Sequence, residues 1–229
     1  MPSLTKALLP AVLILAMAAI ILVAASPQSA PPGPKTSGPE TSGPETSGPS
    51  YTADGHLKMP KNYRQWVYLT TGFDMSYNPA LSMGHHMFDN VFVDPASYKA
   101  FRETGTWPDK TTLVLEQRMG RTGSINKAGN YQDTDIMGLE VHVKDASRFP
   151  GKWAFFGFDN EETGDLFPPG AECYKCHSAH AAVDTTFVQF YPTLLPISKA
   201  KNTLSAGYLA ESAAESSKEP AKENGGAKK

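Results

Sequence analysis

The stretch GLEVHVK, at residues 138–144, alternates apolar with polar side chains. A period of two residues is typical of a β-strand that buries one of its faces. We therefore expect Leu139, Val141 and Val143 to face a core, and Glu140 and His142 to lie on the polar face of the strand. A half-buried strand needs partners, so the rest of the sheet must come from the flanking sequence.

Four further segments are rich in aromatic and β-branched residues, which favour strands. These segments are residues 64–71, 89–94, 111–118 and 152–158. Strands therefore dominate the middle of the chain.

Helices are predicted at two places. Asp94 is a good N-cap, Pro95 suits the first helical position, and the pattern that follows stops at Gly105, which predicts a helix over residues 95–104. Apolar residues at 187–195 also keep helical spacing, with a kink or break expected at Pro192. The chain is thus predicted to be α+β, a mainly antiparallel β-sheet with packed helices.

Composition separates the folded part from its flanks. Residues 26–50 are mostly Pro, Gly, Ser and Thr and repeat the pentad TSGPE, which predicts a flexible linker. Residues 204–229 are largely Ala, Ser, Lys, Glu and Gly, which predicts a low-complexity tail that is disordered or loosely helical. Residues 51–203 are enough for one folded domain. A net charge of −2 gives no indication of a nucleic-acid partner.

The N-terminus indicates export. Lys6 precedes an apolar run of about twenty residues that ends in Val23-Ala24-Ala25, a sequence that suits a signal peptidase. The run is also long enough to span a bilayer. We therefore expect residues 1–25 to be a signal peptide or a membrane anchor, and the protein to be periplasmic, either soluble or anchored by residues 7–25.

The two cysteines of the chain lie together in the segment ECYKCHSAH, at residues 172–180. A dithiol redox pair should follow a strand in a βαβ unit, whereas Cys173 follows a turn-rich segment. A zinc site would need four ligands from eight consecutive residues, which is crowded. In covalent haem attachment, Cys173 and Cys176 form thioethers from one side of a helical turn and His177 ligates the iron. Export fits this third interpretation, which predicts one haem c.

Several segments resemble the cytochrome P460 family, which includes the cytochrome c′-β relatives. They are KMPKNYRQWVYLTTG, FDNVFVDPASYKAF, GLEVHVKDASRFPGKWAFFGF and CYKCHSAHAAVDTTFVQFYPTLLP, and together they cover roughly residues 57–197. The resemblance implies a mainly antiparallel sheet, a homodimer, one covalent haem, and an iron that is open on its distal side. It also implies binding of small nitrogen ligands, nitric oxide or hydroxylamine.

One position departs from the family pattern. The hydroxylamine-oxidising members carry a lysine that cross-links to the haem, and the matching stretch here is WPDKTTLVLEQR, with Leu115 before Glu116. Leucine has no amine, so the cross-link cannot form there. Lys110 lies an odd number of residues away and should point to the opposite face. The substitution disfavours hydroxylamine oxidation.

The distal side of the haem has several candidate residues. Asp89 is a candidate proton relay, although it could instead cap a turn or pair with Arg64, and Phe88 or Phe92 could cover the iron. Possible sixth ligands are His85, His86, Met75, Met83, Met87, Met119 and Met137, whereas His180 is expected at the surface or beside the ligand shell. Three functions stay open: ligand binding, hydroxylamine oxidation, and electron transfer with an unknown redox partner.

Overall fold

The computed structural model describes residues 48–76, 84–123, 125, 127–159 and 162–218, all within one compact unit that spans residues 44–229. The expected signal peptide or anchor at 1–25 and most of the expected linker at 26–50 lie outside the described residues. Among the described residues, no helix combines the length and the hydropathy that a membrane span requires.

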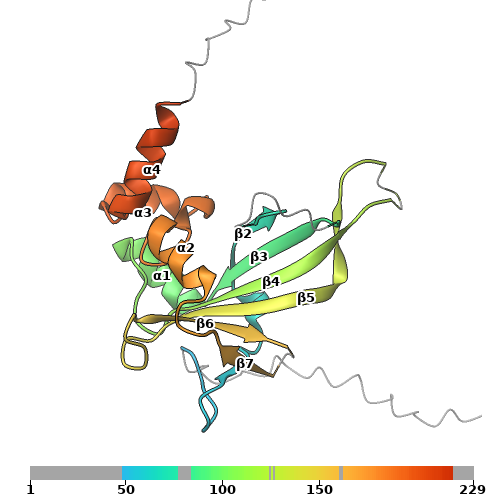
Figure 1. Cartoon of the computed structure of the whole chain (residues 1–229), viewed down its shortest axis with the longest axis horizontal. Coiled ribbons are helices and arrows are strands. Elements are labelled where there is room, and N and C mark those ends of the chain that lie inside the picture. Colours follow the sequence, from blue (N-terminus) through green and yellow to red (C-terminus); the bar gives the residue numbers. More distant parts are fainter. Residues whose placement is uncertain (1–47, 77–83, 124, 126, 160–161, 219–229) are drawn as a thin grey trace, which may run out of the picture. The chain divides into compact units, whose positions relative to one another are not determined.

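Within the described residues, seven strands form one sheet in which every pairing is antiparallel. The spatial order is β1-β7-β6-β5-β4-β3-β2, and Figure 1 shows the labelled strands side by side. The strands are β1 (Leu57–Lys58), β2 (Val67–Phe73), β3 (Met87–Val93), β4 (Thr112–Arg121), β5 (Tyr131–Lys144), β6 (Trp153–Phe158) and β7 (Thr163–Leu166). The five predicted strands are confirmed as β2 to β6. The prediction missed the short strand β1 and also β7, which lies in the segment assigned to a turn-rich loop.

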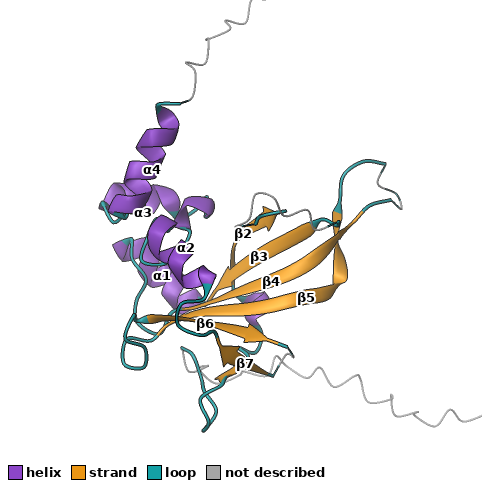
Figure 2. Cartoon of the chain, in the orientation of Figure 1, coloured by secondary structure: helices purple, strands orange, loops and turns teal. Residues whose placement is uncertain are grey.

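Four α-helices accompany the sheet in the described part of the chain. They are α1 (Pro95–Thr104), α2 (Glu172–His180), α3 (Leu195–Lys201) and α4 (Ala206–Ser216), with short 3-10 turns η1 (Tyr63–Gln65) and η2 (Val188–Phe190). Figure 2 shows the helices gathered together beside one end of the sheet. The predicted α+β class with an antiparallel sheet is therefore confirmed.

Helix α1 begins and ends as its sequence predicts. The backbone N–H of Ser97 donates to Asp94 Oδ1 at 2.8 Å, and Gly105 takes a φ of 79° at the C-cap, a conformation that glycine adopts without strain. Asp94 Oδ2 also accepts from the N–H of Thr112 at 3.1 Å. One carboxylate therefore joins the start of α1 to the start of β4.

The helical spacing over 187–195 does not give one helix, and the break expected at Pro192 is confirmed. Residues 188–190 form only the 3-10 turn η2, Tyr191 is extended, and α3 starts at Leu195. Pro192 has no N–H for a helical hydrogen bond, and its ring excludes the helical conformation before it, so the apolar spacing does not produce one helix. Helix α4 lies within the segment 204–229, and the Ser205 side chain caps it by accepting from the N–H of Tyr208.

The two faces of the sheet bury two different cores. On one face, β4 presents Leu113 to a cluster that includes Phe101 of α1 and Leu194. On the other face, Val114 joins Val141 and Phe156 in a second cluster. Alternation along β4 thus sends the neighbouring residues Leu113 and Val114 to opposite cores.

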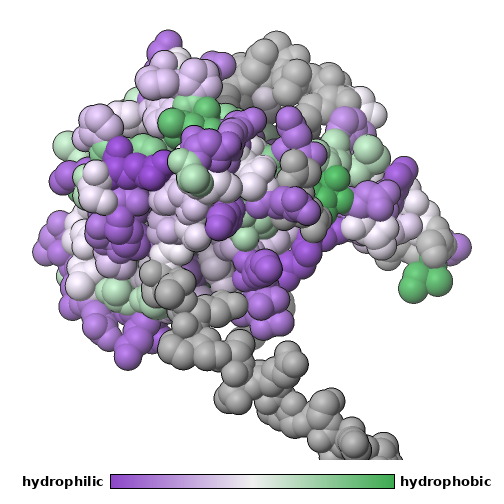
Figure 3. Space-filling model, turned by 90° about the horizontal axis from the view of Figure 1, so that it is seen from below, coloured by the Kyte–Doolittle hydropathy of each residue, from purple (hydrophilic) through white to green (hydrophobic). Residues whose placement is uncertain are grey.

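The surface is mostly polar on the side that Figure 3 displays. Hydrophobic residues on that face form small, separate patches among hydrophilic ones. Single exposed apolar side chains are normal on folded proteins, so this face carries no signal of its own.

Candidate haem site

The Cys-x-x-Cys-His segment forms helix α2. Gly170 turns the chain with a φ of 98°, Ala171 is the N-cap, and Glu172 stands in the first turn, where a negative charge suits the helix dipole. The spacing of Cys173 and Cys176 then brings both side chains to one side of the helix, with His177 next to them. The helical turn that covalent haem attachment needs is therefore present.

A cavity of about 1000 Å³ lies against α2. Its strand wall includes Asp89, Val91, Leu113, Leu115, Gln117, Glu140, His142 and Phe155, and its other wall includes Cys173, Cys176, His177, Phe187, Tyr208 and Glu211. The volume is at the upper end of the range of about 300–1000 Å³ for cofactor and ligand sites. Of the site residues named from the sequence, Cys173, Cys176, His177 and Asp89 all line this one cavity.

His177 is held in the form that a metal ligand requires. Its Nδ1 donates to the carbonyl oxygen of Thr185 at 2.7 Å, which assigns the lone pair to Nε2. The ring packs against Phe187, with centroids 4.1 Å apart, and against Phe155 at 4.7 Å. Burial lowers the pKa of His177 to about 4, so the imidazole is neutral at neutral pH.

Both thiols are half-buried and free of a disulfide. Burial raises the pKa of the Cys173 thiol, and the negative charge of Glu140 adds to this effect. Burial also raises the pKa of the Cys176 thiol, and the charges of Glu172 and Glu211 act in the same direction. Dithiol redox sites depend on a lowered thiol pKa. The cysteines, the neutral imidazole and the cavity therefore fit a covalently held haem better than a redox pair.

Carboxylates from two strands face the same cavity. Asp89 on β3 accepts a hydrogen bond from Gln117 Nε2 at 3.1 Å, and Glu140 lies on β5. Burial is the main cause that raises the pKa of both, and the charge of Asp89 adds to the effect at Glu140. Asp89 does not pair with Arg64, which bonds Glu116 on the opposite face of the sheet.

The prediction drawn from the alternation of β5 is wrong about what surrounds two residues. Glu140 and His142 were assigned to a polar face, but that face lines the cavity and His142 is only 8% exposed. The same alternation of apolar and polar residues occurs whether the polar face of a strand packs against a second layer or is exposed to water. Phe92 was also misplaced, because it packs against Tyr63 on the far side of the sheet.

Leu115 lines the cavity, so the position that would carry the cross-linking lysine faces the site. Among the described lining residues there is no lysine or arginine. Lys110 instead forms an ion pair with Asp145. The site therefore has no amine for a haem cross-link within the part of the chain that the structure describes.

Only some of the other candidate iron ligands lie at the cavity. Met75 lines the cavity, whereas Met87, Met119 and Met137 are not among its lining residues, and Met83 lies outside the described residues. His86 is exposed and its Nδ1 is 2.6 Å from Asp74 Oδ2. His180 lines the edge of the cavity and bonds Glu211 of α4.

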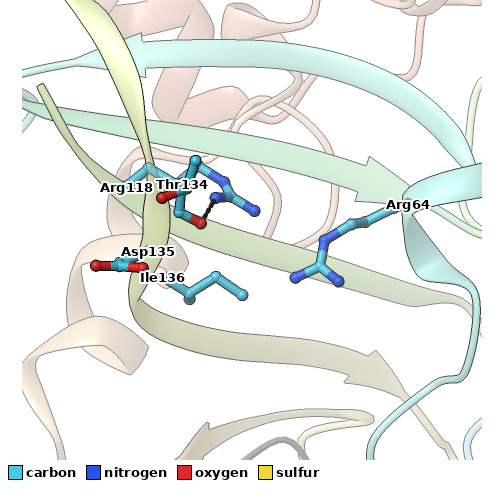
Figure 4. Close-up of a pocket in the computed structure, with 5 residues that line it drawn as sticks. All are labelled: Arg64, Arg118, Thr134, Asp135 and Ile136. Atoms are coloured by element: carbon cyan, nitrogen blue, oxygen red, sulfur yellow. Dashed lines mark hydrogen bonds between the residues drawn. The ribbon is translucent and has the colours of Figure 1, made fainter. Parts of the chain in front are cut away.

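A second, open pocket of about 610 Å³ is lined by Arg64, Arg118, Thr134, Asp135 and Ile136. Figure 4 shows the two arginines reaching into it from different elements, with Arg118 bonded to the Thr134 carbonyl. Both arginines also donate to the buried Glu116. Because their charge is already engaged by that carboxylate, the pocket is explained as the edge of an ion cluster.

The antiparallel sheet, the helix with a Cys-x-x-Cys-His motif and the large cavity beside it are the features expected of a c-type cytochrome. The family model for cytochrome P460 matches residues 60–188, and the chain belongs to this family. Membership supports a mono-haem c-type cytochrome with haem c as its cofactor. No curated protein gives a significant match. Helices α3 and α4 lie beyond the matched residues.

Proposed function

We propose that this protein is an exported cytochrome that binds small nitrogen ligands, such as nitric oxide and hydroxylamine, at the open distal face of its haem. In this proposal Cys173 and Cys176 hold the haem and His177 is the axial ligand. The observation that carries the proposal is that one cavity contains the attachment motif on α2 and the polar Asp89 on β3. Haem supplies an iron that accepts a nitrogen ligand and exchanges electrons with it.

The residues of the chain have separate tasks in this proposal. Thr185 orients His177 through the hydrogen bond to Nδ1. Val91, Leu113 and Leu115 give the strand wall an apolar surface that disfavours water. Asp89 lines the cavity and burial raises its pKa, so its carboxyl group can exchange a proton with a ligand bound there.

Hydroxylamine oxidation is the second candidate, and the carboxylates of Asp89 and Glu140 favour it because the reaction releases protons. Leu115 opposes it, since no lysine is present there to modify the haem. Incubation of the purified protein with hydroxylamine and an added electron acceptor separates the two functions. Ligand binding predicts no sustained turnover, whereas oxidation predicts steady reduction of the acceptor.

Absorption spectra of the ferric, ferrous and nitric-oxide-treated protein test the main proposal. We expect high-spin iron in both oxidation states and rapid uptake of nitric oxide. Double substitution Cys173→Ala/Cys176→Ala should leave pigment that acidified solvent extracts. Lys175→Ala is the matched control, because this exposed residue lies between the two cysteines on the same helix. Low-spin bands that do not respond to nitric oxide would reject the proposal.

Export and assembly belong to the same proposal. We infer a periplasmic location, with residues 1–25 as a signal or anchor, and a homodimer. The edge strand β2 exposes Tyr68 and Phe73, at 54% and 46%, which offers an apolar contact surface for a second copy. Cell fractionation tests the location. Light scattering of the protein and of Tyr68→Glu tests the dimer, which should dissociate in the variant.

A further inference from the structure

A second histidine stands beside the proposed iron ligand. His142 on β5 lies with its ring 5.4 Å from that of His177, centroid to centroid, in an edge-to-face arrangement. Its ring stacks on Phe155 at 3.8 Å with only 12° between the planes, and it also packs on Trp153 at 4.5 Å. These contacts fix the orientation of the His142 ring.

Thr185 connects the two histidines with two different atoms. Its carbonyl oxygen accepts from His177 Nδ1 at 2.7 Å, and its Oγ1 lies 3.2 Å from His142 Nε2, a hydrogen bond. The backbone of Thr185 therefore contacts one imidazole while its side chain contacts the other. Any displacement of Thr185 alters the bond to His177 directly.

The turn that contains Thr185 is held in place by side-chain hydrogen bonds on either side of this residue. Asp184 takes a φ of 52° and accepts from Lys144 Nζ at 2.9 Å, while Thr186 Oγ1 accepts from Trp107 Nε1 at 2.7 Å. Lys144 and His142 lie two residues apart on β5 and project to the same face. Strand β5 thus holds this turn through two neighbouring side chains.

We propose that His142 is a positioning residue that acts through Thr185 to set the orientation and basicity of His177. A firm hydrogen bond at Nδ1 makes an imidazole a stronger electron donor, which stabilises ferric over ferrous iron and lowers the reduction potential. The inference rests on the proposed ligation by His177. It adds to that proposal a residue outside the proposed iron ligands that would control the reduction potential and the strength of the iron–histidine bond.

Two variants break the connection from opposite ends. His142→Phe keeps the stacking on Phe155 but removes the ring nitrogens, and Thr185→Val removes Oγ1 but keeps the carbonyl that accepts from His177. His142→Gln retains a group that can bond Oγ1 and should restore much of the wild-type behaviour. The matched control is His86→Phe, because His86 stacks on Phe73 at 5.1 Å but is not among the described lining residues.

The measurements are haem content, reduction potential and the iron–histidine stretching band of the ferrous holoprotein. We expect full haem loading in all variants, a higher potential and a lower band frequency in His142→Phe and Thr185→Val, and no shift in His86→Phe. The double variant should shift no further than the larger single change, because both substitutions interrupt one path.

The outcomes separate the two proposals. If the wild-type ferrous protein is high-spin but has no iron–histidine band, ligation by His177 fails and this inference fails with it. If the band is present but neither single variant changes its frequency or the reduction potential, only the role of His142 is rejected. Additive shifts in the double variant would also reject the role of His142. Should His142→Phe fail to fold, Thr185→Val alone decides.

Discussion

Arg64 donates from Nε to Oε2 of Glu116 at 2.8 Å, and Glu116 is only 3% exposed. Arg118 and the hydroxyl of Tyr63 donate to the same carboxylate. This buried cluster lies on the face of β4 opposite Leu115 and Gln117, both of which line the haem cavity. Its contribution to stability can therefore be separated from the chemistry of the site.

We expect Glu116→Ala to lower the free energy of unfolding by roughly 3 kcal/mol, because it leaves the half-buried Arg118 without its counter-charge. Arg121→Gln, which breaks the more exposed pair with Asp133, should cost less than about 1 kcal/mol. Denaturant titration measures both. The haem spectrum and nitric oxide uptake should not change, and a spectral change in Glu116→Ala would contradict the separation of the two faces.

The lowered pKa of Glu116 should make the protein less stable in acid. Burial alone would raise the pKa of Glu116, but the bonds from Arg118, Tyr63 and Arg64 outweigh it and lower the pKa. A lowered folded-state pKa stabilises the protein above the ordinary carboxyl pKa, and that contribution disappears as the pH falls through the folded-state value. The difference in stability between wild type and Glu116→Gln should therefore shrink on acidification, as measured by denaturant titration between pH 7 and pH 3.

The contribution of Glu140 to stability should depend on pH in the opposite direction. Burial and the charge of Asp89 raise its pKa, so its contribution to stability is fully present below the ordinary carboxyl pKa and is lost as the pH rises through the folded-state value. Glu140→Gln should therefore be more stable than wild type at pH 7 and equal to it near pH 3. Glu103→Gln, on the exposed side of α1, is the control and should change neither value. Equal stability of Glu140→Gln and wild type across this range would refute the prediction.

Met75 decides between ligand binding and electron transfer. It lines the cavity, and a thioether is a possible sixth ligand. Because we propose an open distal face, Met75→Leu should leave the absorption spectrum of both oxidation states unchanged, as should the control Met87→Leu. Conversion of a low-spin to a high-spin spectrum in Met75→Leu alone would establish methionine ligation and favour the electron carrier.

The sequence is informative where the signal is local. Asp94, Pro95 and Gly105 determine α1 through their own conformational preferences, so its bounds agree with the prediction. Period-two alternation likewise located the second half of β5. Residues 131–137, YQDTDIM, have no such alternation and are held in β5 by pairing with β4 across two register shifts. That pairing depends on a distant strand and leaves no local pattern.

The site was only partly predictable for the same reason. The spacing of Cys173, Cys176 and His177 is a local property of one helix, so their position on one side of a helical turn could be predicted from the motif alone. The placement of Glu140 and His142 depends on which layer covers β5, and this is decided by α2 and the segment after it. Alternation separates the two faces of a strand but does not say what each face meets.

Helix α4 gives the last prediction. It lies beyond the residues that the family model matches, packs on α2 through Gly207 and the pair of Glu211 with His180, and contributes Tyr208 and Glu211 to the cavity. It therefore forms part of the cavity wall, and we expect it to limit the access of a ligand. Removal of residues 206–229 should raise the association rate of nitric oxide severalfold in stopped-flow measurements, with haem attachment intact.

Two controls make this test specific to α4. Removal of residues 219–229 alone should leave the rate unchanged, because it retains the whole helix. Glu211→Gln should give a smaller increase than the truncation, since both His180 and Glu211 are well exposed and such pairs contribute less than about 1 kcal/mol. An unchanged rate after complete removal of α4 would show that the ligand enters by another route, between the strand wall and the segment around Phe187, both of which also line the cavity.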